Sequence, residues 1–167
     1  MRYIHRCASP LGGILLAADG EGLTGLWFEG QKFFARGLDV KYQEKDLPVF
    51  GQVVRWLDTY FRGKEPDFTP PLHLAGTPFQ ITVWRGLLTI PYGETETYGG
   101  LARRCGLSGG MARAVGGAVG RNPVSVIVPC HRVVGADGSL TGYAGGTGRK
   151  ARLLELERST VASGREL

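Results

Sequence analysis

A proline-rich stretch divides the 167-residue sequence into two parts. Residues 62–78 include Pro66, Pro70, Pro71 and Pro78. Proline lacks a backbone N–H and disfavours helical geometry in the residue before it, so this stretch cannot continue a helix or a central strand. We therefore expect an extended linker here. Two domains are predicted, residues 1–75 and residues 76–167, with the boundary near Gly76.

The first part alternates short apolar runs with turn residues. The runs cover residues 3–9, 14–19 and 23–28, and Pro and Gly residues separate them. This pattern is typical of an antiparallel strand meander. From residue 47 to 61 the apolar residues follow helical spacing, with Trp56 flanking them, Pro48 in the first turn and Gly63 after the end. A small α/β domain with an antiparallel sheet and one long helix is expected.

The second part has mainly helical patterns. Helices are expected over residues 79–89, 97–105, 111–119 and 150–158. Thr97 can cap the second of them. The glycine-bearing turn at 106–110 joins the second and third helices, which indicates a helix-turn-helix, although such hairpins also occur in proteins that do not bind DNA. Asp137 and Gly138 predict a turn, followed by a short return over residues 140–143.

The excess of positive charge lies entirely in the second part. Residues 1–75 contain nine Lys or Arg and nine Asp or Glu, whereas residues 76–167 contain eleven and six. A basic surface attracts polyanions such as DNA. Charge alone is equally compatible with a basic surface that has no nucleic-acid role.

The cysteines indicate a reducing environment. Cys7, Cys105 and Cys130 are odd in number and form no Cys-x-x-Cys pair, which argues against a disulfide framework and a structural zinc site. The N-terminus lacks the apolar run of a signal peptide, and no stretch approaches the about 20 apolar residues of a membrane span. We expect a cytoplasmic protein with no bound metal and no membrane contact.

The densest chemical motif is Pro129-Cys-His-Arg-Val133. A cysteine reacts as the thiolate, and a neighbouring cation or base makes the thiolate accessible. An isolated cysteine is more often a buried structural residue. The imidazole of His131 and the guanidinium of Arg132 next to Cys130 favour a reactive thiol.

This motif is part of a wider resemblance. With Ala112-Arg-Ala-Val-Gly-Gly117, Asn122-Pro-Val124 and Gly142-Tyr143, it resembles the O6-alkylguanine-DNA alkyltransferases, also called methylated-DNA–protein-cysteine methyltransferases. The resemblance covers nearly all of residues 76–167 and is weaker before them, where Ser9-Pro-Leu-Gly12 is its best match. It implies an α+β fold, with a ribonuclease H-like α/β domain followed by a mostly helical winged helix-turn-helix domain.

The activity implied by the resemblance is DNA repair by direct reversal. The protein would move an alkyl group irreversibly, and once, from O6-alkylguanine (and from O4-alkylthymine) in DNA to its own Cys130. No cofactor is implied, because the alkyl donor is the damaged base. The implied partner is double-stranded DNA bound through the minor groove by a monomer.

The resemblance assigns roles to five catalytic residues. Cys130 accepts the alkyl group, and His131, oriented by Glu157, takes the thiol proton through a bound water. Tyr98 donates to guanine N3 as charge develops on the departing base. Asn122 braces the turn between recognition helix and active-site loop. Taken singly, Tyr98 would be an ordinary half-buried aromatic, Asn122 a helix C-cap and Glu157 a surface acid.

Base recognition is implied for the loop that follows. The backbone carbonyls of Cys130 and Val133 would accept from the guanine amine, which adenine lacks. The backbone N–H of Ala144, after Tyr143, would point at the alkylated O6. The family commonly has serine or glycine at position 144, so alanine keeps this backbone contact and loses any hydroxyl contribution.

The helix over residues 111–119 is poor in bulky side chains. Gly116 and Gly117 each cost about 1 kcal/mol of helix propensity relative to alanine, yet small residues let a helix press into a minor groove about 6 Å wide. The resemblance implies that Ala112 and Gly116 contact DNA. Arg113 would replace the extruded nucleotide in the base stack. The alternative is a glycine-rich helix packed on another helix, with Arg113 merely solvated.

Three other functions are less consistent with these residues. Alkyltransferase-like lesion-binding proteins lack the acceptor cysteine and commonly have tryptophan there. A helix-turn-helix regulator would carry bulky polar base-reading side chains on its recognition helix. In a cysteine hydrolase the histidine usually lies far from the cysteine in sequence. Cys130 and its neighbours therefore favour the transferase.

Overall fold

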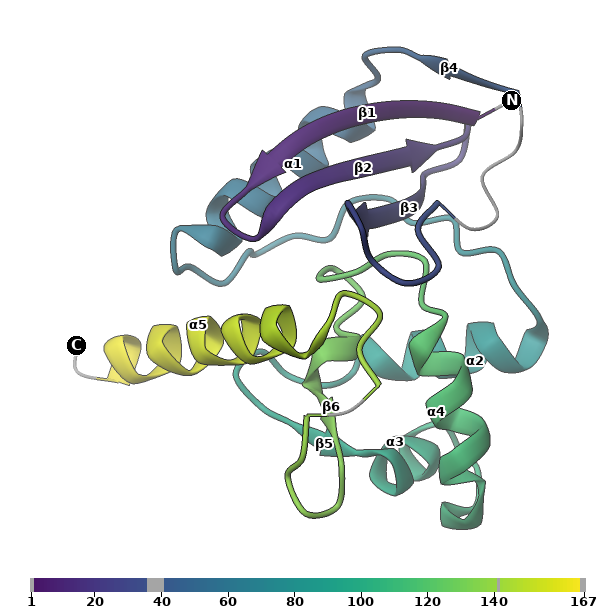
Figure 1. Cartoon of the computed structure of the whole chain (residues 1–167), viewed down its shortest axis with the longest axis vertical. Coiled ribbons are helices and arrows are strands. Elements are labelled where there is room, and N and C mark those ends of the chain that lie inside the picture. Colours follow the sequence, from purple (N-terminus) through teal and green to yellow (C-terminus); the bar gives the residue numbers. More distant parts are fainter. Residues whose placement is uncertain (1, 36–40, 141, 166–167) are drawn as a thin grey trace.

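Figure 1 shows the computed structural model, which describes residues 2–35, 41–140 and 142–165. A strand-rich N-terminal part lies above a mostly helical C-terminal part in this view, and helix α1 (Pro48–Phe61) covers one face of the sheet. This is the α+β fold class that the sequence predicts.

The N-terminal sheet contains the three strands expected from the sequence. Strands β1 (Arg2–Ser9), β2 (Gly12–Ala18) and β3 (Leu23–Phe28) form an antiparallel meander in the order β3-β2-β1. A further strand, β4 (Tyr42–Glu44), pairs in parallel with β1. The sequence did not predict β4, because its residues are all exposed and show no apolar alternation.

Helix α1 buries one side against the sheet. Its buried residues are Phe50, Val53, Trp56, Leu57 and Tyr60. Trp56, expected to flank the apolar face, is part of it and is 7% exposed. Pro48 occupies the first turn, and Gly63, with φ 81°, follows the end of the helix in a conformation that favours glycine. Tyr60 in the last turn is fully buried.

Between the turn that ends α1 and the start of α2 at Pro78, the predicted linker has no helix, and part of it lies along β3. The N–H of Leu23 donates to the carbonyl of Pro71 over 2.8 Å, and the N–H of His73 donates to the carbonyl of Leu23 over 2.8 Å. The linker is therefore hydrogen-bonded to β3 along part of its length.

The C-terminal part is built mainly of helices. Its elements are α2 (Pro78–Leu87), β5 (Glu96–Thr97), α3 (Tyr98–Arg104), η1 (Gly109–Met111), α4 (Ala112–Gly120), η2 (Cys130–Arg132), β6 (Val133–Val134) and α5 (Thr147–Arg165). The side chain of Thr97 caps α3 by accepting from the N–H of Gly100. Helices α3 and α4 and the connection between them are the segment in which a helix-turn-helix was expected. Helix α5 extends beyond the expected residues 150–158 at both ends.

The sequence predicts a short return of the chain over residues 140–143. Residues 140, 142 and 143 have no regular secondary structure, and residue 141 lies outside the described residues. Gly142 has φ 75°, a left-handed conformation that breaks an extended segment. Strand β6 pairs with β5, in parallel, which places the chain after Cys130 beside the start of α3.

The main hydrophobic cluster extends through both parts of the molecule. It includes Phe28 and Tyr60 from the N-terminal part and Val124 and Leu153 from the C-terminal part. A backbone hydrogen bond also joins the two parts: the N–H of Leu26 in β3 donates to the carbonyl of Pro123 over 2.8 Å. The turn that leads to Cys130 is therefore anchored on the sheet.

Candidate active site

Cys130 begins η2, directly after a tight turn. Val126 in this turn has φ 67°, a left-handed conformation that costs a β-branched residue about 1–3 kcal/mol. Both flanks of the turn are fixed, since the N–H of Val128 donates to the carbonyl of Val124 over 3.1 Å and that of Cys130 to the carbonyl of Val128 over 2.8 Å. Cys130 is 5% exposed, so the turn holds its thiol inside the molecule.

The side chain of Asn122 spans this turn. Its Oδ1 accepts from the N–H of Val124 over 3.0 Å, and its Nδ2 donates to the carbonyl of Val128 over 2.8 Å. Asn122 is itself 5% exposed. The amide thus ties the end of α4 to the segment before the cysteine, which is the place where the sequence predicted a brace.

The Cys130 thiol is protonated at neutral pH in this resting structure. Burial raises its pKa to about 11, although a hydrogen bond from Asn122 and the positive charge of Lys150 both act in the opposite direction. A neutral thiol is a poor nucleophile. Reaction at Cys130 therefore needs a group that removes its proton.

His131 is a fully buried imidazole next to the thiol in sequence. Its Nε2 lies 2.5 Å from Oε2 of Glu157. Burial lowers the pKa of His131, so the ring is neutral at pH 7. Because a carboxylate only accepts hydrogen bonds, Nε2 carries the ring proton and Nδ1 carries a lone pair. Nδ1 is buried and has no hydrogen-bond partner among the described residues, so its lone pair is available to a proton.

Glu157, on α5, is ionised and 1% exposed. Its Oε1 accepts from Nε of Arg132 over 2.8 Å and from the N–H of Gly93 over 3.0 Å. Its Oε2 accepts from the hydroxyl of Tyr60 over 2.6 Å as well as from His131. Burial raises the pKa of Glu157, but the hydrogen bonds and positive charge of its partners outweigh burial and lower the pKa to about 2.

Sequence reasoning missed most of the groups that hold Glu157. Tyr60 lies at a core position of α1 and Gly93 contributes only its backbone, so neither carries a sequence signal for this role. Arg132 was noticed as a neighbour of the cysteine, but its guanidinium points away to Glu157 and to the carbonyl of Ile90, 2.7 Å from Nη1.

Lys150 is a second unexpected group. Its side chain is 1% exposed, and the ammonium donates to the backbone carbonyl of Val133. Burial lowers the pKa of Lys150, and the neighbouring Cys130 thiolate would raise it. A buried cation therefore lies close enough to Cys130 to favour its thiolate.

Tyr98 and Tyr143 are associated with the loop after β6. A side chain on Gly116 would place Cβ 3.5 Å from Cδ1 of Tyr98, and one on Gly142 would place Cβ 3.0 Å from the Tyr98 hydroxyl oxygen. Tyr143 is 8% exposed; burial raises the pKa of its phenol, as does the nearby Cys130. Tyr98 is thus packed between α4 and the loop that carries Tyr143.

Arg113 lies apart from this cluster, on the exposed side of α4. The opposite side of the helix is fixed, because it buries Val115 and Val119 and because the indole of Trp84 donates to the carbonyl of Ala118 over 2.9 Å. No ion pair or hydrogen bond is seen for the Arg113 side chain within the part of the chain that the structure describes. Ala112 is half-buried at the start of the same helix.

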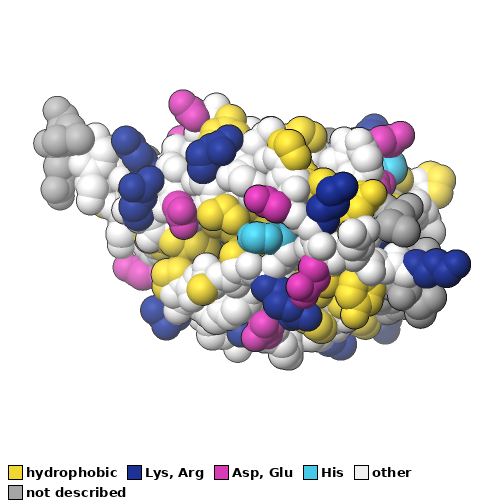
Figure 2. Space-filling model, turned by 90° about the horizontal axis from the view of Figure 1, so that it is seen from above, with side chains coloured by type: hydrophobic (Ala, Val, Ile, Leu, Met, Phe, Trp, Pro, Cys, Tyr) yellow, Lys and Arg dark blue, Asp and Glu magenta, His cyan; other side chains and the backbone are white. Residues whose placement is uncertain are grey.

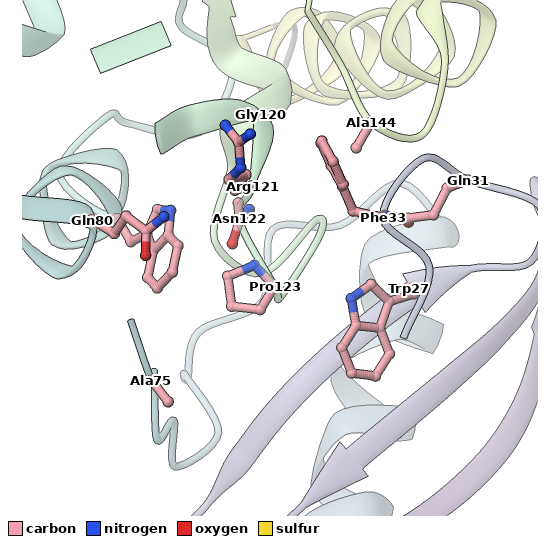
Figure 3. A pocket seen from close by; sticks show the side chains of 11 residues that line it. Trp27, Gln31, Phe33, Ala75, Gln80, Gly120, Arg121, Asn122, Pro123 and Ala144 are labelled. Carbon is pink, nitrogen blue, oxygen red and sulfur yellow. The ribbon is translucent and has the colours of Figure 1, made fainter. Parts of the chain in front are cut away.

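Ala144 borders a cavity of about 280 Å³ between the two parts of the chain (Figure 3). Trp27 and Phe33 contribute to its wall from the N-terminal part, and Asn122 from the C-terminal part. The carbonyl of Ala144 accepts from the N–H of Lys32 over 3.0 Å. The active-site loop is therefore in direct contact with the loop after β3.

The surface over the N-terminal sheet mixes both signs of charge. Figure 2 shows this end of the molecule, with basic and acidic side chains interspersed. Nη1 of Arg6 in β1 lies 4.0 Å from Oε1 of Glu29, which follows β3, and Nε of Arg6 lies 3.8 Å from Oε1 of Glu44 in β4. Over the described ranges, no group of three or more His, Cys, Asp or Glu side chains could hold a metal ion, and no helix is long and apolar enough to cross a membrane.

Comparison with known proteins matches both parts of the chain to domains of one family. Residues 2–74 match a family model described as the ribonuclease-like domain of 6-O-methylguanine DNA methyltransferase, and residues 78–159 match the DNA binding domain of the same family. A protein named methylated-DNA–protein-cysteine methyltransferase from Mycobacterium leprae is 46% identical over 161 residues, which are 96% of this chain and 95% of the relative.

Solved structures agree with these matches. The crystal structure of the Mycobacterium tuberculosis O6-methylguanine methyltransferase is 46% identical, with a TM-score of 0.83, over 96% of this chain and 94% of that one. The crystal structure of Mycobacterium tuberculosis OGT in complex with DNA is 47% identical, with a TM-score of 0.84, over 95% and 94%.

Proposed function

We propose that the reaction of this protein takes place on Cys130. The chain belongs to the methylated-DNA–protein-cysteine methyltransferase family. The protein repairs DNA by moving an alkyl group from a damaged base to a cysteine. The observation that carries the assignment to Cys130 is its position beside a neutral, buried His131 that is paired with an ionised Glu157.

The reaction is a displacement at the alkyl carbon. The sulfur of Cys130 attacks that carbon, a C–S bond forms and the bond from carbon to guanine O6 breaks, with its electron pair going to the base. His131 takes the thiol proton through a bound water and is oriented by Glu157. The departing guanine takes up a proton at N1 from water, and the protonated His131 returns its proton to water, so the products are a thioether and normal guanine. Tyr98 donates to guanine N3 as negative charge develops there.

The damaged base is recognised by backbone groups around the thiol. The carbonyls of Cys130 and Val133 accept from the guanine amine, and the N–H of Ala144 faces O6, next to Tyr143. A carbonyl oxygen has two lone pairs, so Val133 can accept from guanine while it accepts from Lys150. The same pocket would admit O4-alkylthymine.

DNA binds through α4. Ala112 and Gly116 face the minor groove, and the exposed Arg113 fills the space that the extruded nucleotide leaves. The protein acts as a monomer and needs no cofactor. It works in the cytoplasm, a reducing compartment that suits its odd number of cysteines. We place the domain boundary near Gly76, so that residues 1–75 and 76–167 form the two domains.

Intact-protein mass spectrometry tests the assignment. Incubation with duplex DNA containing O6-methylguanine should add the mass of one methyl group to each chain, and no more with longer incubation. Cys130→Ala should gain nothing yet still bind the duplex, whereas Cys7→Ala and Cys105→Ala should react like the wild type. A methylated peptide that contains Cys7 or Cys105, formed near the wild-type rate, would show that Cys130 is not the acceptor.

A further inference from the structure

We propose that Tyr60, on α1 in the N-terminal part, is a positioning residue for the transfer reaction, because its hydroxyl fixes the Glu157 carboxylate that orients His131. This role presupposes the proposed function, in which His131 is the base. It gives the N-terminal part a direct share in the chemistry, beyond supporting the domain that carries Cys130.

The geometry connects Tyr60 to both members of the relay. Its hydroxyl donates to Oε2 of Glu157 over 2.6 Å, and the same oxygen lies 3.5 Å from Nε2 of His131. Tyr60 is completely buried. Burial and the negative charge of Glu157 both raise the pKa of its phenol, so the hydroxyl stays protonated and can only be a donor towards the carboxylate.

Neighbouring rings hold the phenol in place. Trp56 stacks on Tyr60 with ring centroids 5.2 Å apart and an interplanar angle of 9°, and Phe61 and Tyr92 meet it edge-on at 5.2 Å and 6.1 Å. The end of α1 also lies against α5, because a Cβ on Gly63 would be 3.6 Å from the hydroxyl oxygen of Thr160. The Tyr60 hydroxyl therefore has little freedom to leave Glu157.

Tyr60 also affects His131, the base, because both residues hydrogen-bond to the same oxygen of Glu157. Oε2 of Glu157 accepts from both Tyr60 and His131, so the phenol takes up part of the negative charge that would otherwise favour a protonated imidazole. The charged groups that face His131 are Glu157, Arg132 and Lys150, and of these only Glu157 favours the imidazolium. Without the phenol O–H, the pKa of His131 should rise and the carboxylate should lose one of its anchors.

The competing explanation is that Tyr60 is only a core aromatic. Tyr60→Phe separates the two, because phenylalanine keeps the ring and removes the hydroxyl. Tyr92→Phe is the matched control: it also deletes a phenol oxygen from the same aromatic cluster, and no hydrogen bond from Tyr92 to Glu157 or His131 is seen among the described residues.

The experiment is the rate of alkyl transfer against pH, from pH 5 to 9, for the wild type and both variants. Duplex O6-methylguanine and free O6-benzylguanine serve as donors, so that DNA binding can be separated from chemistry. Tyr60→Phe should slow transfer about tenfold at pH 7 with both donors, the lower end of what a hydrogen bond to a charged group contributes. The acidic limb of its profile should move up by about one pH unit. Tyr92→Phe should match the wild type within about twofold.

A double-mutant cycle keeps the test decisive if Tyr60→Phe also lowers stability. In a Glu157→Gln background, Tyr60→Phe should slow transfer by clearly less than it does in the wild type, because the carboxylate it fixes is gone. An unchanged rate, or a slower rate with an unmoved pH profile and additive effects, would make Tyr60 a core residue only. Absence of any methyl on wild-type Cys130 would instead refute the proposed function.

Discussion

The side-chain amide of Asn122 donates to the backbone carbonyl of Val128, 2.8 Å away, and so closes the turn that leads to Cys130. The same side chain acts to lower the pKa of the buried Cys130 thiol. Any group added to the sulfur must therefore fit against a rigid, strained turn. The resting protein and the alkylated protein should differ in stability for this reason.

Methylation of Cys130 should destabilise the protein. Cys130 is 5% exposed, and an added methyl group crowds a packed interior, which typically costs about 1–3 kcal/mol. The spent protein should melt several degrees lower than the free protein and should be cleaved faster by protease. Protein incubated with undamaged duplex is the control. Identical melting curves for free and methylated protein would contradict this prediction.

Removal of the base should slow alkyl transfer strongly. His131→Phe should lower the rate by about 10²- to 10⁴-fold, the usual cost of losing a general base. Glu157→Gln should act in the same direction but less, because Glu157 orients the base and accepts no proton from the thiol. Single-turnover kinetics from pH 6 to 9 measure both effects, with melting curves to show that each variant is folded. Wild-type rates in both variants across this range would rule out the relay.

Acid should destabilise the protein through two buried groups. Burial lowers the pKa of His131 below its ordinary 6.5, so the unfolded chain takes up this proton first. Its contribution to stability is full above about pH 6.5 and is lost as the pH falls below it. The pKa of Glu157 is lowered from 4.5 to about 2, so its contribution is full above about pH 4.5 and is lost towards pH 2.

A comparison between the wild type and a variant tests the His131 contribution, which is lost over the higher of these two pH ranges. The difference in melting temperature between the wild type and His131→Asn should narrow as the pH falls from 7 to 5, because only the wild type loses the His131 contribution. Groups shared by both proteins cancel in the difference. A difference that stays constant or widens over this range would show that His131 is not held neutral.

Arg113 should matter for extrusion of the base rather than for its chemistry. Arg113→Ala should slow repair of duplex DNA, while transfer from free O6-benzylguanine stays at the wild-type rate. The defect should shrink when the lesion lies opposite an abasic site or in a mismatch, since extrusion then costs less. If Arg113 only contacts phosphate, the defect should instead follow ionic strength. If duplex repair by Arg113→Ala recovers fully at low salt and does not depend on base pairing, Arg113 is a solvated residue and does not fill the base stack.

The sequence predicted the elements that carry strong periodic signals. The β1–β3 meander, α1 and the helices α2 to α5 all appear, because alternation, helical spacing and capping residues such as Thr97 act locally. Strand β4 was missed, since its exposed residues pair through the backbone alone. The short return over residues 140–143 stays a prediction, because residue 141 lies outside the described residues.

The site was predictable where residues form a motif, and the pairing of His131 with Glu157 was expected from the resemblance. Cys130, His131 and Arg132 are adjacent, and Asn122 belongs to a recognisable segment, so their neighbourhood could be expected. The partners of Glu157 come from distant elements and include a core phenol, Tyr60, and a backbone N–H. Such contacts depend on how helices pack across the molecule, which no local pattern encodes.

Glu157 receives its hydrogen bonds from distant segments, and the first of them, Tyr60, lies 97 positions before it in the chain. Cys130 precedes Glu157 in the chain, so translation adds the thiol first. A nascent or truncated chain that ends before α5 would therefore carry the acceptor thiol without an oriented base. Such a fragment would be a nearly inert thiol, so termination before Glu157 should produce molecules that are counted as protein but not as repair capacity.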